Sequence, residues 1–107
     1  MAEWRNWSGS VEAQPMAVER PRTIEVLQTL VAGAEKVRVV GAGHSFMPLC
    51  ATDGLLLSLL DLEGELAPAA DGQSVWVPAG WPIGKLTDAL WRIGFSLVNQ
   101  GDIDKQA

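Results

Sequence analysis

Apolar and polar positions alternate with different periods along the chain, and each period predicts an element. Residues 17–20, two apolar side chains followed by two polar ones, are interpreted as a short half-buried strand that Pro21 ends. Apolar side chains then recur at helical spacing over residues 24–31, with Thr23 suited to the N-cap and Gly33 to the end of the helix. Three valines within residues 37–40 predict a second strand. The first part of the chain therefore predicts a β-α-β unit.

The second half of the chain contains further strand and helix patterns. The leucine-rich run at residues 55–60 lies between turn signals and is too short for a helix, so it predicts a strand. Residues 74–77 predict another strand, which Pro78 ends. Residues 83–93 place apolar side chains on one face of a second helix, with Gly94 as its cap. The pattern as a whole predicts an α+β fold with a mixed sheet and two main helices.

Length and composition predict one small domain. The chain has 107 residues, of which 48% are hydrophobic, and this is enough for a single core. Residues 1–16 are polar and small and are interpreted as an N-terminal tail, followed by a folded unit at residues 17–98. Residues 99–107 are polar and are interpreted as the start of another segment.

Charge and cysteine content narrow the classes of partner and compartment. The net charge is −5 and the eight basic residues are scattered, which argues against a nucleic-acid surface. No apolar run approaches the length of a membrane span, and the N-terminus lacks the pattern of a signal peptide. Cys50 is the only cysteine, so no internal disulfide can form. These features together predict a cytoplasmic protein.

Two other chemistries are weighed and set aside on the residues alone. Asp61, Glu63 and Glu65 would point the same way on an extended chain, but no Asn or second His stands nearby, so a solvated loop is favoured and no metal site is expected. Cys50 follows His44 by six residues and could form a nucleophile pair with it. A buried or incidental cysteine is the favoured interpretation.

The strand at residues 37–40 opens into Gly-Ala-Gly-His-Ser, residues 41–45, which include the only histidine of the chain. A run of bare backbone amides after a strand can cradle phosphate oxygens, although an ordinary turn carries similar weight. The Rossmann and phosphate-loop motifs both fail, because Phe46 replaces the third glycine and no Gly-Lys-Ser/Thr follows. The functional hypothesis is that this loop holds the pyrophosphate of a dinucleotide and that His44 faces its reactive end.

Four motifs, taken in order, resemble the vanillyl-alcohol-oxidase type (PCMH type) of FAD-binding domain. They are Val-Arg-Val-Val-Gly-Ala-Gly-His-Ser-Phe at residues 37–46, Thr-Asp-Gly at residues 52–54, Val-Pro-Ala-Gly at residues 77–80 and Asn-Gln-Gly-Asp-Ile-Asp at residues 99–104. The likeness runs from about Trp7 to Ala107. Within the family, the chain most resembles the sugar-1,4-lactone oxidases and dehydrogenases of the gulonolactone and arabinonolactone type, and their alditol-oxidase relatives.

The resemblance implies an FAD domain of two α+β subdomains with the flavin between them. Residues 17–98 would then form the first FAD-binding subdomain, as a small β-α-β unit, and residues 99–107 would begin the second FAD-binding segment. His44 matches the histidine that in many members bonds covalently to the 8α carbon of the flavin. The residues that match cofactor-contacting positions are Gly41, Ala42, Gly43, His44, Ser45, Gly101 and Asp102.

The implied activity is that of an FAD-dependent oxidoreductase acting on CH–OH donors, in which hydride passes from a sugar lactone or polyol to the flavin. The family's large substrate domain is not among these 107 residues, so the chain is expected to be an N-terminal fragment that is inactive alone and holds no catalytic residue. The alternative is a non-catalytic truncated α+β module that self-associates or binds a protein partner through exposed apolar surface.

Overall fold

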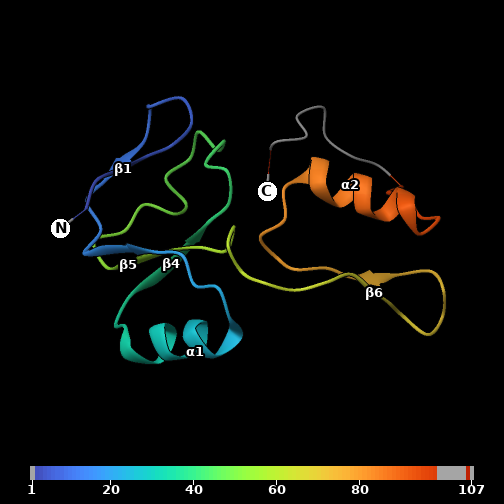
Figure 1. Cartoon of the computed structure of the whole chain (residues 1–107). Helices are drawn as coiled ribbons and strands as arrows, with labels where there is room; N and C mark the ends of the chain where they lie inside the picture. Colours follow the sequence, from blue (N-terminus) through green and yellow to red (C-terminus); the bar gives the residue numbers. More distant parts are fainter. Residues whose placement is uncertain (1, 99–105, 107) are drawn as a thin grey trace.

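The computed structural model describes residues 2–98 and residue 106, and its strands form three small sheets (Figure 1). The elements in chain order are β1 (Trp4–Arg5), β2 (Glu12–Ala13), β3 (Ala17–Glu19), α1 (Ile24–Gly33), β4 (Val37–Val40), β5 (Leu55–Ser58), β6 (Ala67–Pro68), β7 (Val75–Trp76) and α2 (Ile83–Arg92). β1 and β2 form an antiparallel hairpin, as do β6 and β7. The predicted α+β class with two helices is confirmed, and its parallel and antiparallel pairings occur in separate sheets.

The central sheet is parallel and has the order β3-β5-β4. The two strands of the predicted β-α-β unit are therefore not neighbours, because β5 lies between them and pairs with both. The first residue of β5, Leu55, is opposite Ala17 of β3 and Val37 of β4. The leucine-rich run thus forms the middle of the sheet, although the strand ends at Ser58 and does not reach residue 60.

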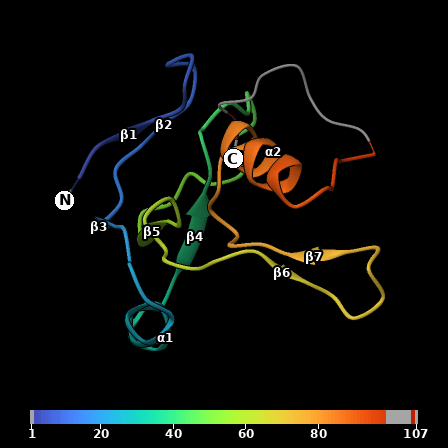
Figure 2. The ribbon, with the colours of Figure 1, turned by 45° about the vertical axis from the view of Figure 1, so that its right-hand side comes forward.

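The core is built around β5. Leu56 and Leu57 are both 0% exposed, and since successive side chains of a strand point to opposite faces, β5 is covered on both sides. Figures 1 and 2 both show α1 on one side of this sheet and the β1–β2 hairpin on the other. α1 begins at the predicted N-cap, where Thr23 Oγ1 accepts a hydrogen bond from the Val26 amide at 3.2 Å.

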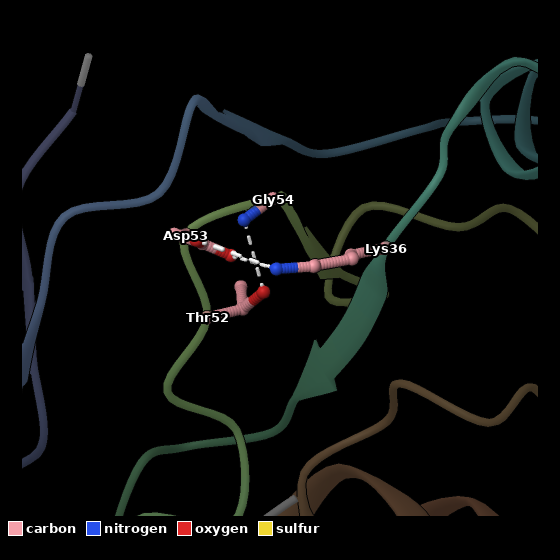
Figure 3. A network of polar contacts seen from close by, with 4 residues as sticks. All are labelled: Lys36, Thr52, Asp53 and Gly54. Carbon is pink, nitrogen blue, oxygen red and sulfur yellow. Dashed lines mark hydrogen bonds and ion pairs between the residues drawn. The ribbon is translucent and has the colours of Figure 1, made fainter.

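Polar contacts fix the register at the beginning of β4 and β5 (Figure 3). The Leu55 amide donates to the Lys36 carbonyl at 2.9 Å, and the Gly54 amide donates to Thr52 Oγ1 at 3.0 Å. The ammonium group of Lys36 lies 3.1 Å from Oδ1 of Asp53. The Thr-Asp-Gly motif therefore forms the turn that starts the central strand beside β4.

The acidic stretch after β5 contains two ion pairs with the segment that joins β3 to α1. Arg20 Nη2 lies 2.9 Å from Asp61 Oδ1, and Arg22 Nη2 lies 2.7 Å from Glu63 Oε1. All four side chains are largely exposed, which agrees with the predicted solvated loop. Within the described part of the chain, no group of three or more His, Cys, Asp or Glu side chains could hold a metal ion.

The remaining elements extend away from the central sheet. The β6–β7 hairpin and α2 lie on its far side from β3 (Figure 2), and α2 buries Leu90. Both ends of α2 agree with the sequence prediction to within one residue. No helix formed by the described residues is long and apolar enough to cross a membrane.

Candidate functional site

The glycine loop, residues 41–45, leaves the carboxyl end of β4. Ligands of α/β sheets tend to bind beyond the carboxyl ends of parallel strands, so the loop lies where a ligand is expected. Gly43 has a φ of +74°, a conformation that side-chain-bearing residues rarely adopt. An added Cβ there would contact the Trp4 ring at 3.5 Å and the Trp7 amide nitrogen at 3.6 Å, so the backbone conformation, more than space, requires glycine.

The loop forms one wall of an open pocket of about 300 Å³. Its described lining residues are Val39, Val40, Gly41, Ala42, Gly43, His44, Ser45, Leu49, Cys50 and Gln106. None of these lining residues is an acid, although the chain as a whole has a net charge of −5. An anion in this pocket would meet backbone amides, a hydroxyl and an imidazole without meeting a carboxylate from the described lining.

The backbone groups of the loop are divided between two directions. The Gly43 carbonyl accepts a hydrogen bond from the Trp7 amide at 2.6 Å, and the Ser45 carbonyl accepts one from Asn6 Nδ2 at 2.8 Å. Among the hydrogen bonds of the described residues, none uses the N–H groups of residues 42–44. These amides have no partner among the described residues, and a run of such donors can form an anion-binding concavity.

His44 is held between residues from both ends of the chain. Its imidazole stacks on the Trp7 indole, with ring centroids 5.0 Å apart and the ring planes 22° apart. Gln106 Nε2 lies 3.5 Å from Nδ1 of His44, at the outer limit of a hydrogen bond. The half-buried imidazole also lines the pocket, so it faces an open groove at the end of a strand.

Of the other site residues predicted from sequence, Ser45 makes a local contact and two lie outside the described residues. Ser45 Oγ accepts a hydrogen bond from the Met47 amide at 3.1 Å, which is the local turn role that competed with a phosphate contact. Cys50 shares the pocket wall with His44. Gly101 and Asp102 lie outside the described residues, as does most of the segment assigned to residues 99–107.

Two site residues come from the stretch interpreted as an N-terminal tail. Asn6 and Trp7 lie in the turn between β1 and β2, and both contact the glycine loop. The sequence offered one signal for them: tryptophans in a short polar stretch, Trp4 and Trp7 among them, are expected to pack on something distant along the chain. The partner could not be identified from sequence, because nothing local links residue 7 to residue 44.

Comparison with known proteins places these observations in a family. The family described as FAD binding domain matches residues 15–106. The chain is 34% identical over 108 residues to L-gulono-1,4-lactone dehydrogenase of Mycobacterium tuberculosis, with 97% of this chain and 25% of that protein covered. It is 34% identical over 112 residues to D-arabinono-1,4-lactone oxidase of Saccharomyces cerevisiae, covering 97% of this chain and 21% of the relative.

A vertebrate relative matches over the same stretch. L-gulonolactone oxidase of Scyliorhinus torazame is 27% identical over 109 residues, with 98% of this chain and 25% of the relative covered. The chain thus spans about a quarter or less of the length of these relatives. The resemblance drawn from the glycine-loop and turn motifs is confirmed. The chain belongs to the FAD binding domain family, of the PCMH type, and its cofactor is FAD.

Proposed function

We propose that the glycine loop holds the pyrophosphate of FAD and that His44 lies toward the isoalloxazine. The observation that carries this proposal is the set of unengaged amides at residues 42–44, which border a pocket whose described lining contains no acid. A diphosphate needs several donors at close range, and backbone amides provide them without a lysine. Membership of the FAD binding domain family supports FAD as the ligand. The geometry of the glycine loop supports this position for the pyrophosphate.

We also propose that His44 would hold the flavin through a covalent link, as the matching histidine does in many family members. As the bond from an imidazole nitrogen to the 8α carbon forms, the imidazole N–H bond and one 8α C–H bond would break. The two protons and two electrons would pass to the flavin, which an electron acceptor of the whole protein would then reoxidise. A neutral imidazole nitrogen is a competent nucleophile near neutral pH, and the half-buried ring lines the pocket. Stacking on Trp7 covers one face of the imidazole and leaves its edges for bonding. One of those edges, Nδ1, already lies near the amide of Gln106.

For the whole protein we propose an FAD-dependent oxidoreductase whose substrate is a sugar lactone or a polyol. The names of the gulonolactone and arabinonolactone relatives support this substrate class. The bound flavin would accept the hydride removed from the alcohol carbon. Residues 17–98 serve as the first FAD-binding subdomain and residues 99–107 begin the second FAD-binding segment. No residue described here is assigned to substrate binding or to proton removal.

Titration of FAD into the purified chain tests the loop assignment through quenching of flavin fluorescence. Gly43→Ala is the informative variant, and Gly72→Ala is its matched control, because Gly72 also has a positive φ, of 68°, but lies in the β6–β7 turn. Each variant should lose about 1–2 kcal/mol of stability, the cost of a left-handed backbone for a residue with a Cβ. Only Gly43→Ala should weaken FAD binding. Equal FAD affinities for the two variants, or no quenching by the parent chain, would contradict the proposal.

The alternative function, a module that associates with itself or with a protein partner, is favoured by one observation. Several large apolar side chains are strongly exposed, including Trp76 at 76% and Trp91 at 77%. Exposed apolar surface promotes association where it is contiguous. A dimer in sedimentation measurements, together with no response to FAD, would favour this alternative over cofactor binding.

A further inference from the structure

The turn of the β1–β2 hairpin contacts the glycine loop on both sides of His44. The Trp7 amide donates to the carbonyl of Gly43, and the Asn6 side chain donates to the carbonyl of Ser45. The flanking positions of the loop are therefore attached to the same two consecutive residues. The hairpin holds this stretch at two points, and His44 lies between them.

Asn6 is built into this contact by three side-chain hydrogen bonds. It is 5% exposed, and its Nδ2 donates to Ser10 Oγ at 3.1 Å as well as to the Ser45 carbonyl. Its Oδ1 accepts from the Val11 amide at 3.0 Å. A buried side-chain amide with all these partners is costly to replace, because truncation leaves several polar groups without partners. The side chain thus joins the hairpin turn to the loop.

The two carbonyl contacts also determine which way the loop amides point. In a trans peptide the C=O and the following N–H point in opposite directions, and the described chain contains no cis peptide bond. Because the carbonyls of Gly43 and Ser45 face the hairpin, the N–H groups of His44 and Phe46 point away from it. No hydrogen bond among the described residues uses either of these two N–H groups.

We propose that Asn6 and Trp7 are positioning residues for the cofactor loop. The two hydrogen bonds orient the N–H groups of His44 and Phe46 away from the hairpin, where a ligand can reach them, and the Trp7 indole fixes the plane of the His44 imidazole by stacking on it at 5.0 Å. This inference deepens the proposed function: that the ligand is FAD rests on that proposal. The orientation of the loop and ring is a property of the chain itself and can be measured without flavin.

Proton NMR of the chain without flavin tests the stacking, because His44 is the only histidine and gives a single set of imidazole resonances. We expect nuclear Overhauser contacts between the Trp7 indole and the His44 ring, and an upfield shift of the imidazole protons. The shift should disappear in Trp7→Leu, persist in Trp7→Phe and persist in Trp91→Leu, whose tryptophan is exposed on α2. Absence of the contacts in the parent chain, or an unchanged shift in a folded Trp7→Leu, would overturn the proposal.

Hydrogen exchange tests the hydrogen bonds separately. The Trp7 amide should be protected in the parent chain, and Asn6→Ala should lower this protection by about tenfold, as expected for loss of a supporting buried hydrogen bond. Gln73→Ala is the control, because its side chain lies in the distant β6–β7 turn. If Asn6→Ala does not fold, protection in the parent chain still decides: an unprotected Trp7 amide would overturn the proposal.

FAD titration of the same variants separates this inference from the proposed function. If both hold, Trp7→Leu and Asn6→Ala bind FAD more weakly than the parent chain, and Trp7→Phe restores binding. If the parent chain shows the NMR contacts but does not bind FAD, the positioning inference stands and the proposed ligand fails. If FAD binds equally to all variants, the ligand stands and the positioning role fails.

Discussion

Lys36 and Asp53 form an ion pair at the start of two neighbouring strands. Nζ of Lys36 lies 3.1 Å from Oδ1 and 3.4 Å from Oδ2 of Asp53 (Figure 3). The hydrogen bond from Lys36, and then its charge, lower the pKa of the Asp53 carboxyl below its ordinary value of 3.8. Both side chains are exposed, so the pair contributes to the register of β4 and β5 more than to overall stability.

We predict a small, pH-dependent loss of stability in Asp53→Asn. A carboxylate whose folded pKa is lowered contributes stability that is complete above its unfolded pKa and is lost as the pH falls through the folded pKa. The parent chain should therefore be slightly more stable than the variant near neutral pH, and the difference should vanish below the folded pKa. Urea unfolding at about pH 7, and at a series of falling acid pH values continued until the difference levels off, measures both differences.

Asp88→Asn is the matched control, because it removes the same charge from α2, where no ion pair of Asp88 occurs among the described residues. High salt should reduce the effect of Asp53→Asn, since exposed charges are screened. A difference that persists unchanged at acid pH and in high salt would contradict the electrostatic explanation.

Truncation of a buried side chain in the central strand, β5, should strongly destabilise the protein. Leu57→Ala removes a side chain that is 0% exposed and should cost about 2–5 kcal/mol, which is a large part of the stability of a small domain. Leu49→Ala is the control, because Leu49 is 70% exposed and its truncation should change little. Chemical denaturation of both variants checks this prediction. Equal losses would show that β5 is not the centre of the core.

The local elements could be predicted from sequence because local signals determine them. Thr23 caps α1 through its own hydroxyl, and the valines of β4 form a strand with the predicted bounds. The pairing of strands could not be predicted, because it depends on contacts between residues far apart along the chain. β5 was expected to be a strand, but nothing in its leucines indicated that it would lie between β3 and β4.

The same distinction explains what was found at the candidate site. The glycine loop and His44 could be recognised from the sequence alone, because glycines that follow a strand pattern and a single histidine need no knowledge of the fold. Asn6 and Trp7 reach the loop only because the turn of the β1–β2 hairpin lies against the glycine loop that follows β4, a contact across 37 residues between Trp7 and His44. Positioning residues of this kind can be recognised only in the folded structure.

The covalent link through His44 can be tested on the complete protein by intact-mass analysis after denaturation. We expect the parent protein to retain the mass of FAD and His44→Ala to lose it, because alanine offers no nucleophile. Trp7→Phe serves as the comparison, since it keeps an aromatic ring beside the imidazole. Release of all flavin from the denatured parent protein would show that the cofactor is bound without a covalent bond.

Gly80, in the Val-Pro-Ala-Gly motif, is predicted to be irreplaceable for a reason of packing. It is buried, and a Cβ there would overlap the carbonyl of Leu59, just beyond the end of β5. Gly80→Ala should therefore push apart the central sheet and the segment leading to α2, at a cost of at least about 1–3 kcal/mol. Gly33→Ala is the matched control: it lies at the end of α1 with no atom near its added Cβ, and it should gain about 0.5–1 kcal/mol because glycine disfavours helix. The midpoint temperature of thermal unfolding should thus fall in Gly80→Ala and rise in Gly33→Ala. A stabilised or unchanged Gly80→Ala would mean that this close approach does not hold the two parts of the chain together.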